Sequence, residues 1–347
     1  MRIGPAKLAA NEVYFIAEAG VNHNGDLDVA EALIDAAADA GADAVKFQTF
    51  TAERLVTASA RTVDYQRESA GVETQREMLE QYELDRADHE RLIAYADDRE
   101  ITLLSSPFDE QSASLLADLG LPAIKIGSGE LTNTPLLAHV AELGRPMIVS
   151  TGMSTMAEVH TAREAIRDVA PELPVAFMHC TSEYPAPMSA VNLRAMERMN
   201  AELPEPVGYS DHTTAVETPA MAVAAGARLL EKHFTLDRSL PGPDHEASLE
   251  PGELASAVDL AHEAAVARGS PEKQPTEGEL ENRSAIRKSL HAASAVEAGQ
   301  PLTAETLAIV RPADGLAPAE FQRVLGTRVT KSLQSGDPIT ETVLEPE

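Results

Sequence analysis

One pattern recurs eight times along the first 268 residues: a short, nearly continuous apolar run ends in polar residues and leads into a more polar segment. Apolar runs without alternation are typical of parallel strands that are buried on both faces. Eight strand-then-helix units predict an α/β fold of the (β/α)8 TIM-barrel type. The expected strands are 13–19, 44–49, 102–106, 123–127, 147–151, 175–181, 207–210 and 229–234.

Helical patterns lie between these runs, and the segment 27–40 is the clearest of them. Its apolar residues share one face, Asp26 stands at the expected cap position, and Gly41 follows the last turn. A doubly wound open sheet is the main alternative, but the loop GVNHNG at 20–25 lacks the GxGxxG spacing of such folds. The other expected helices are 85–99, 110–119, 134–143, 155–169, 215–225 and 251–268.

The composition changes after Arg268. Residues 269–284 are rich in Pro, Gly, Glu and Gln, which predicts an exposed linker between a barrel domain at 1–268 and a small β-rich domain at 285–347. Within this tail, VEAGQPLT (296–303) and LQSGDPIT (333–340) form a weak repeat in which the Gly and Pro positions align. Two matching turns predict pseudo-symmetry; a chance match between common turn sequences is the alternative.

The charge balance excludes several classes of function. The chain has 28 Lys and Arg against 56 Asp and Glu, a net charge of −28, so it repels nucleic acid and anionic membranes. Disorder is disfavoured because 44% of the residues are hydrophobic. An acidic, lysine-poor composition predicts a source adapted to high salt, with a merely acidic mesophile as the alternative.

Cysteine content and the apolar runs bear on location. Cys180 is the single cysteine, which rules out an intrachain disulfide and a cysteine-based zinc site. Residues 1–10 show no signal-peptide pattern, and no apolar run approaches the length of a membrane span. We therefore expect a cytoplasmic protein.

Polar side chains follow every expected strand, where barrel enzymes place their functional groups. Three of the few lysines, Lys46, Lys125 and Lys232, lie on predicted buried strands. Because a buried ammonium is costly unless it is paired or functional, they predict a pocket for a small, multiply anionic substrate. For Lys232 a second interpretation is equally open, a structural ion pair with Glu231.

Two histidines, His212 and His233, end neighbouring expected strands and could share a divalent metal ion, although two imidazoles do not specify which one. The rigid loop 239–248 carries Asp244, which could bind substrate hydroxyls or a metal-bound water, or simply cap a turn. Weaker ligand candidates are His23, His179 and His245.

The motifs FIAEAGVNHNGDL, VKFQTF, SSPFD, KIGSGE, STGM, HCTSEYPAP, GYSDHT, EKHFT and PGPDH occur in this order along the chain. In this combination the chain resembles the N-acetylneuraminate (sialic acid) synthase family, which includes the legionaminic and pseudaminic acid synthases. The tail from about Arg287 resembles that family's antifreeze-like (SAF, β-clip) domain.

The resemblance implies condensation of phosphoenolpyruvate with an N-acylmannosamine-type sugar, giving a nonulosonic acid and phosphate. A 2,4-diacetamido-2,4,6-trideoxy sugar, as in legionaminic or pseudaminic acid synthases, is the alternative acceptor. The resemblance also implies a divalent cation, Mn²⁺ or Mg²⁺, held by His212 and His233. The positions that match the family's phosphoenolpyruvate site are Glu18, Lys46, Ser106, Lys125, Ser128, Ser182, Ser210 and His212.

The sugar-facing positions implied by the resemblance are Gln48, Glu130, Tyr184 and Asp244, and those with catalytic roles are Glu18, Glu130, Asp244 and His212. In a domain-swapped homodimer, the arginine that reaches the partner's sugar would be Arg311. Some family members have asparagine at the position of Ser182, which bears on the choice of sugar. A 3-deoxy-octulosonate-type synthase is disfavoured by the tail, and a non-enzymatic carbohydrate- or ice-binding protein by the lysines and paired histidines.

Overall fold

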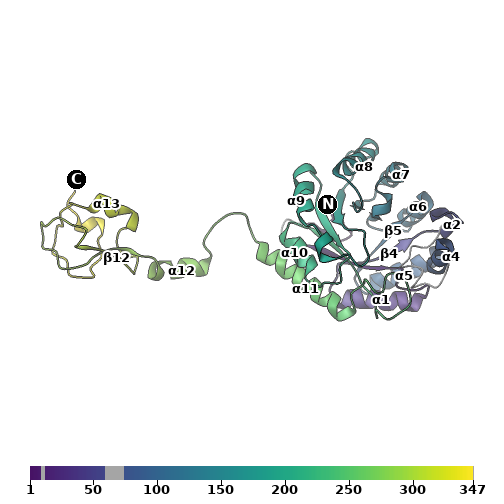
Figure 1. Cartoon of the computed structure of the whole chain (residues 1–347), viewed down its shortest axis with the longest axis horizontal. Coiled ribbons are helices and arrows are strands. Elements are labelled where there is room, and N and C mark those ends of the chain that lie inside the picture. Colours follow the sequence, from purple (N-terminus) through teal and green to yellow (C-terminus); the bar gives the residue numbers. More distant parts are fainter. Residues whose placement is uncertain (9–11, 59–73, 347) are drawn as a thin grey trace. The chain divides into compact units, whose positions relative to one another are not determined.

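The structure, a computed structural model, describes residues 1–8, 12–58 and 74–346. The chain divides into two compact units, Met1–Gly269 and Ser270–Glu347 (Figure 1). Among the described residues, no helix is long and apolar enough to cross a membrane.

The first unit is a nearly closed parallel barrel of eight strands, as the sequence predicts. The strands pair in the order β5-β4-β3-β10-β9-β8-β7-β6, and the two end strands lie against each other. A two-residue hairpin, β1 (Arg2–Ile3) with β2 (Ala6–Lys7), precedes them. The barrel strands are β3 (Tyr14–Gly20), β4 (Ala44–Thr49), β5 (Thr102–Pro107), β6 (Ile124–Ile126), β7 (Met147–Ser150), β8 (Val175–Cys180), β9 (Val207–Asp211) and β10 (Leu229–His233).

Helices surround the strands (Figure 1). The first, α1 (Leu27–Asp39), begins where expected because the Asp26 side chain accepts hydrogen bonds from the backbone N–H groups of the first turn. The pattern did not predict α9 (Arg194–Glu202), whose only buried residues are Met196 and Met199. The others are α2 (Ala52–Leu55), α4 (Gln75–Leu79), α5 (Arg86–Asp98), α6 (Glu110–Asp118), α7 (Thr134–Glu142), α8 (Met156–Val169), α10 (Thr218–Ala224) and α11 (Pro251–Arg268).

Strand alternation sorts the side chains into two cores. Residues that point outward pack under the helices, as Phe15, Val149 and Tyr209 do. The residues that alternate with them point into the barrel. Toward the amino ends of the strands, the interior is filled by apolar side chains such as Ile16, Met178 and Leu229. Further toward the carboxyl ends of the strands, the inward positions become polar, and these positions form the site described below.

The second unit is built from two similar halves around its own apolar core. Val296 and Leu333, which begin the two repeats, pair with each other as an antiparallel bridge. The backbone N–H of Gly299 donates to Val329, and that of Gly336 donates to Ala292, so corresponding glycines make corresponding bonds. The weak repeat is therefore a structural one. The regular elements are α12 (Glu277–Ile286), β11 (Ser289–Ala292), β12 (Leu307–Val310) and α13 (Phe321–Val324).

Helix α12 lies in the segment that the sequence predicts to be a linker. It begins with a capping box, in which the Thr276 hydroxyl and the Glu279 carboxylate bond to each other's backbone N–H. It has no buried residue among those described, so its side chains are solvated like those of the linker around it.

Candidate active site

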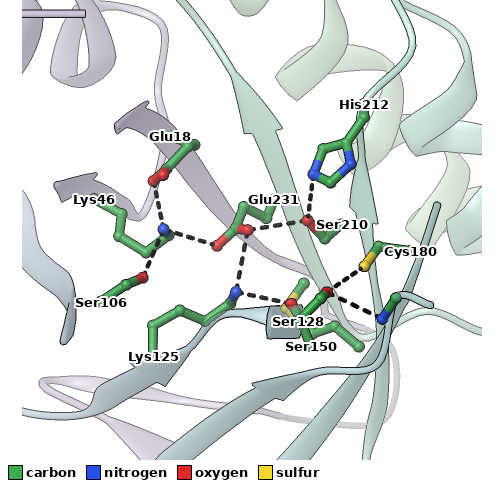
Figure 2. Close-up of polar contacts among 12 residues, drawn as sticks. Glu18, Lys46, Ser106, Lys125, Ser128, Ser150, Cys180, Ser210, His212 and Glu231 are labelled. Carbon is green, nitrogen blue, oxygen red and sulfur yellow. Dashed lines mark hydrogen bonds and ion pairs between the residues drawn. The ribbon is translucent and has the colours of Figure 1, made fainter. Parts of the chain in front are cut away.

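Four charged side chains form the floor of the pocket at the carboxyl ends of the strands (Figure 2). Lys46 Nζ lies 2.6 Å from Glu18 Oε2 and 3.7 Å from Glu231 Oε2. Lys125 Nζ lies 3.3 Å from Glu231 Oε1. Each of these side chains is at most 4% exposed, so the floor is a buried chain of alternating charge.

Hydroxyl groups from four strands and loops complete the floor (Figure 2). Lys46 donates to Ser106 Oγ at 3.0 Å, and Lys125 donates to Ser150 Oγ at 2.8 Å. Ser210 Oγ donates to Glu231 at 3.0 Å. The backbone N–H of Gly152 donates to Ser128 Oγ, which is also 3.0 Å from Cys180 Sγ. Ammonium and hydroxyl donors converging in this way suit a carboxylate or phosphate ligand.

The two floor carboxylates have opposite electrostatic environments. Burial raises the pKa of Glu18 to about 7, although Lys46 acts against this. Burial also acts to raise the pKa of Glu231, but Lys125 and Lys46 together outweigh it and lower the pKa to about 2. Glu231 therefore remains ionised, while Glu18 can gain or lose a proton near neutral pH.

The pocket above this floor has a volume of about 830 Å³, within the range of small-molecule sites. One wall is polar and carries Ser128, Ser182 and Ser210. Another part of the lining is an apolar cluster formed by Val21, Met78, Leu79, Tyr82 and Phe108.

The imidazoles of His212 and His233 lie side by side at the mouth, with ring centroids 5.3 Å apart. His212 Nδ1 lies 2.6 Å from the Thr181 carbonyl oxygen, so this nitrogen donates and the lone pair lies on Nε2. Tyr184 stacks against His212 with a centroid distance of 4.2 Å. Burial lowers the pKa of His212 to about 4 and holds that of His233 well below its ordinary value, so both rings are neutral.

These histidines fit a divalent cation. Neutral imidazole is the metal-binding form, and His233 Nδ1 is buried without a hydrogen-bond partner among the described residues. Its nearest acidic neighbour is Asp244, whose Oδ2 is 3.9 Å away. The described residues contain no cluster of three His, Cys, Asp or Glu side chains for a metal. A cation here would therefore leave several coordination positions for substrate oxygens and water.

Asp244 reaches the pocket from the loop after β10. Its Oδ2, a Glu18 oxygen and the Gln48 amide nitrogen all approach the α-carbon of Gly20, where a Cβ would lie about 3.4–3.5 Å from each. Gly20 has φ of +55° and ends β3 at a bulge, so glycine is required there by the backbone. Burial raises the pKa of Asp244 to about 6.

Most of the predicted site residues meet in this pocket. The lining includes Glu18, Lys46, Gln48, Ser106, Lys125, Ser128, Ser182, Tyr184, Ser210, His212, His233 and Asp244.

Two predicted site residues lie elsewhere. Glu130 is not among the pocket-lining residues, and its carboxylate accepts a hydrogen bond of 2.7 Å from Asn133. Arg311 follows β12 in the second unit, at an exposed position.

The weaker histidine candidates are also accounted for. His179 points outward and bonds the Val191 carbonyl at 2.9 Å. His245 lies 2.7 Å from the Thr235 hydroxyl, and His23 accepts from the backbone N–H of Gly25. None of the three joins His212 and His233.

Lys232 does not line the pocket, so the pocket-lysine interpretation is wrong for it. Its side chain is 0% exposed and pairs with Asp211 at 2.6 Å, not with Glu231. The structural alternative is correct in kind but names the wrong partner. Strand alternation gives the reason, because Glu231 and His233 point inward and Lys232 between them points outward.

Three residues of the floor were not singled out as site residues from the sequence: Glu231, Ser150 and Cys180. The missed signal was again the alternation. Glu231 lies two positions before His233 on β10, and Cys180 lies two positions after the inward-facing Met178 on β8, so each pair faces the same side of its strand.

A barrel that combines buried lysines, a set of hydroxyls and two neutral histidines at one mouth defines an enzyme for a small anionic substrate. The NeuB family model matches residues 33–273, and a SAF domain model matches residues 287–345. This chain belongs to the NeuB family.

Relatives agree over nearly the whole chain. An N,N'-diacetyllegionaminic acid synthase from Legionella pneumophila is 43% identical over 327 residues, covering 93% of this chain and 92% of the relative. The N-acetylneuraminate-9-phosphate synthase of Homo sapiens is 35% identical over 334 residues, covering 96% and 92%. The crystal structure of N-acetylneuraminic acid (sialic acid) synthetase from Leptospira borgpetersenii in complex with citrate has a TM-score of 0.74 at 33% identity, covering 81% of this chain and 94% of that one.

Proposed function

We propose that this enzyme condenses phosphoenolpyruvate with an N-acylmannosamine-type sugar, giving a nonulosonic acid and inorganic phosphate. The observation that carries the proposal is the meeting of two buried lysines and two neutral histidines in one pocket. The two lysines suit a molecule with a carboxylate and a phosphate, and the two histidines suit a metal cation that binds a carbonyl oxygen. The names of the relatives, which are synthases of nonulosonic acids, support the same reaction.

The floor binds phosphoenolpyruvate in this proposal. Lys46 and Lys125 neutralise its two anionic groups, and the hydroxyls of Ser106, Ser128 and Ser182 donate to their oxygens, while Ser210 keeps its bond to Glu231. Ser182 Oγ is buried without a partner among the described residues, which is consistent with a donor that serves a ligand.

The acceptor sugar lies above the floor with its open-chain aldehyde toward the histidines. A divalent cation on His212 and His233, Mn²⁺ or Mg²⁺, would polarise the aldehyde oxygen. C3 of phosphoenolpyruvate forms a bond to the aldehyde carbon, and the electron-poor C2 then takes up water. Loss of phosphate from the resulting tetrahedral carbon leaves the keto group of the product. Asp244, raised in pKa and near His233, suits the proton transfer to or from water better than Glu130, which does not line the pocket.

The names of the relatives favour a 2,4-diacetamido-2,4,6-trideoxy acceptor, because the legionaminic relative is 43% identical and the 9-phosphate synthase 35% identical. Among the described residues, the lining of a single barrel offers no further cation for a phosphate on the acceptor, apart from the Arg311 that the domain swap proposed below would bring. Lys46 and Lys125 are the only Lys or Arg residues among its described lining, and both are committed to the floor.

The test is mass spectrometry of the products from phosphoenolpyruvate, Mn²⁺ and a panel of these sugars. We expect one nonulosonic acid and an equal amount of phosphate, both lost in His212→Ala. The proposal fails if the purified protein consumes no phosphoenolpyruvate with any sugar of the panel, or if His212→Ala is as active as the wild type.

We also propose a domain-swapped homodimer in which Arg311 serves the partner's barrel. A mixed-subunit experiment tests this: His212→Ala and Arg311→Ala subunits are inactive alone, but when they are mixed and allowed to exchange, one intact site forms per hybrid dimer. Absence of recovered activity in a dimer shown to exchange would contradict the swap.

A further inference from the structure

A sealed cluster of polar side chains lies on the outer side of β9 and β10, behind the pocket. Lys232 Nζ lies 2.6 Å from Asp211 Oδ2 and 3.2 Å from Thr213 Oγ1, and it also donates to the Thr213 carbonyl oxygen. Asp211 in turn accepts from the backbone N–H of Thr213 at 2.9 Å and from its hydroxyl at 3.2 Å. We call Lys232, Asp211 and Thr213 the brace.

Stability alone does not account for the brace. The Lys232 and Asp211 side chains are both 0% exposed, so each charge has lost its hydration. Replacing a buried ion pair by apolar residues of similar size is often neutral or stabilising, because desolvation offsets the attraction. No substrate can reach the pair, since Lys232 does not line the pocket. What an ion pair supplies here, and an apolar contact does not, is a fixed backbone geometry.

The brace surrounds the backbone of His212. Asp211 and Thr213 are its two chain neighbours, and one ammonium bonds to both of them. The same ammonium belongs to Lys232, which directly precedes His233 on the adjacent strand and pairs with Asp211 in the sheet register. One side chain thus ties together the two strand ends from which the histidines project.

We propose that Lys232 is a positioning residue that fixes the separation and orientation of the His212 and His233 imidazoles. The inference rests on the proposed function, in which these two rings hold the divalent cation. Ring contacts with Tyr184 and the bond from His212 Nδ1 to Thr181 orient the imidazole itself. The brace instead acts on the backbone from which the His212 side chain projects. With only two protein ligands, a metal site depends strongly on their mutual placement.

The test measures Mn²⁺ binding to the full-length protein without substrates, by calorimetry and by the electron paramagnetic resonance signal of free Mn²⁺. The variant is Lys232→Met/Asp211→Asn, which removes both charges and leaves none unpaired. The control is Arg163→Met, which removes one ion-pair partner of Glu205, a residue just before β9 at the opposite end of that strand, and leaves Glu205 paired with Arg167 at 2.8 Å. Thermal unfolding is followed in every variant.

We expect the brace variant to bind Mn²⁺ about 10–100-fold more weakly and the control variant to bind within about twofold of the wild type. The visible spectrum of bound Co²⁺ should also change in the brace variant alone. If the brace variant does not fold, Thr213→Val, which keeps the ion pair, should still weaken Mn²⁺ binding by about threefold on the same grounds.

Folded brace variants that bind Mn²⁺ as the wild type does would overturn the positioning role. Failure of the proposed function looks different: the wild type would then bind Mn²⁺ no better than His212→Ala does, whatever the brace variants show.

Discussion

The pocket floor and the brace are two buried ionic clusters at the same end of one barrel, and they differ in what they face. The floor, from Glu18 to Lys125, lies beneath the pocket, and its two lysines, Lys46 and Lys125, line that pocket, where a bound anion can reach them. In the brace, Lys232 and Asp211 bond to each other and to Thr213, the Tyr209 hydroxyl donates to Asp211, and neither charged side chain is exposed. Ligand binding can therefore complete the floor, whereas the brace is complete in itself.

The difference shows how burial should be interpreted for a charged residue. Lys46, Lys125 and Lys232 are equally buried and all lie on strands. What separates a ligand-binding lysine from a structural one is the side of the strand on which it lies and whether its partners are already satisfied. Substitution of one lysine in each cluster therefore separates the two functions.

The largest effect is expected in the floor. Lys125→Met removes the cation between Glu231 and the bound anion, and truncating one partner of a buried charged pair costs about 2–5 kcal/mol. We expect kcat/KM for phosphoenolpyruvate to fall on the order of 10³-fold, mostly through KM. Phosphate release under steady-state conditions measures it. A change of KM below tenfold would show that Lys125 does not contact the substrate.

The corresponding change in the brace acts on stability. Lys232→Met leaves Asp211 buried without its cation, so the free energy of unfolding should fall by about 3 kcal/mol. At saturating Mn²⁺ the KM for phosphoenolpyruvate should stay within about twofold of the wild type, because no atom of Lys232 lines the pocket. Urea unfolding and steady-state kinetics on the same preparation measure both. A large rise in this KM would remove the distinction between floor and brace.

The fold followed from local patterns in the sequence, and most of the site followed from those patterns together with the family resemblance. Apolar runs at regular spacing gave the strands, and the polar residues after them gave Lys46, Ser106 and His212. The pocket interpretation of Lys232 was wrong because it placed Lys232 and His233 in the same pocket, although successive residues on a strand point to opposite sides. The same alternation would have identified Glu231.

Other features depend on contacts that a single sequence does not contain. The pairing of Lys232 with Asp211 joins residues 21 positions apart, and its partner could not be chosen before the strand order was known. The position of the Glu130 side chain depends on Asn133, whose side-chain amide donates a hydrogen bond to the Glu130 carboxylate. The role of Arg311 stays a prediction, since it concerns the barrel of a second subunit.

Protonation provides a third contrast, because Glu18 titrates near neutral pH. Its pKa is raised to about 7, from an ordinary value of 4.5, so between these values the folded protein keeps a proton that the unfolded chain has released. This contribution to stability is complete below pH 4.5 and is lost as the pH rises through 7. Glu18→Gln stays neutral, so relative to the wild type it should gain about 2 kcal/mol in unfolding free energy between pH 5 and pH 8.

Glu231→Gln is the control for this measurement. The pKa of Glu231 is lowered to about 2, so its contribution is present above pH 4.5 and is lost only as the pH falls toward 2. Its own titration therefore adds nothing between pH 5 and pH 8, and a difference from the wild type in that range reports the lower pKa of Glu18 once the neighbouring Glu231 charge is gone. Urea midpoints at four pH values decide the matter, and parallel curves for Glu18→Gln and the wild type would show that Glu18 is already ionised at pH 5.

The smallest expected effect comes from Gly152, whose backbone lies against the hydroxyls of Ser128 and Ser182. It tests whether this glycine keeps those hydroxyls in position for a ligand. A Cβ on Gly152 would overlap the Ser182 hydroxyl and lie 2.8 Å from both Cys180 Sγ and Ser128 Oγ. Gly152→Ala must therefore displace hydroxyls that face the pocket, and we expect KM for phosphoenolpyruvate to rise about tenfold with little change in kcat.

The control is Gly252→Ala at the start of α11, where no atom lies within 4 Å of the added methyl group, so KM should not change. Because Gly152 lies beside the pocket, its neighbours can move into open space, and the loss of stability should stay near 1 kcal/mol, as for a modest overpacking. Gly152→Ala could instead destabilise the protein without raising KM. The hydroxyls around Gly152 would then support the barrel, as the brace does. In that case the contrast between an open floor and a closed brace would not extend to this side of the pocket.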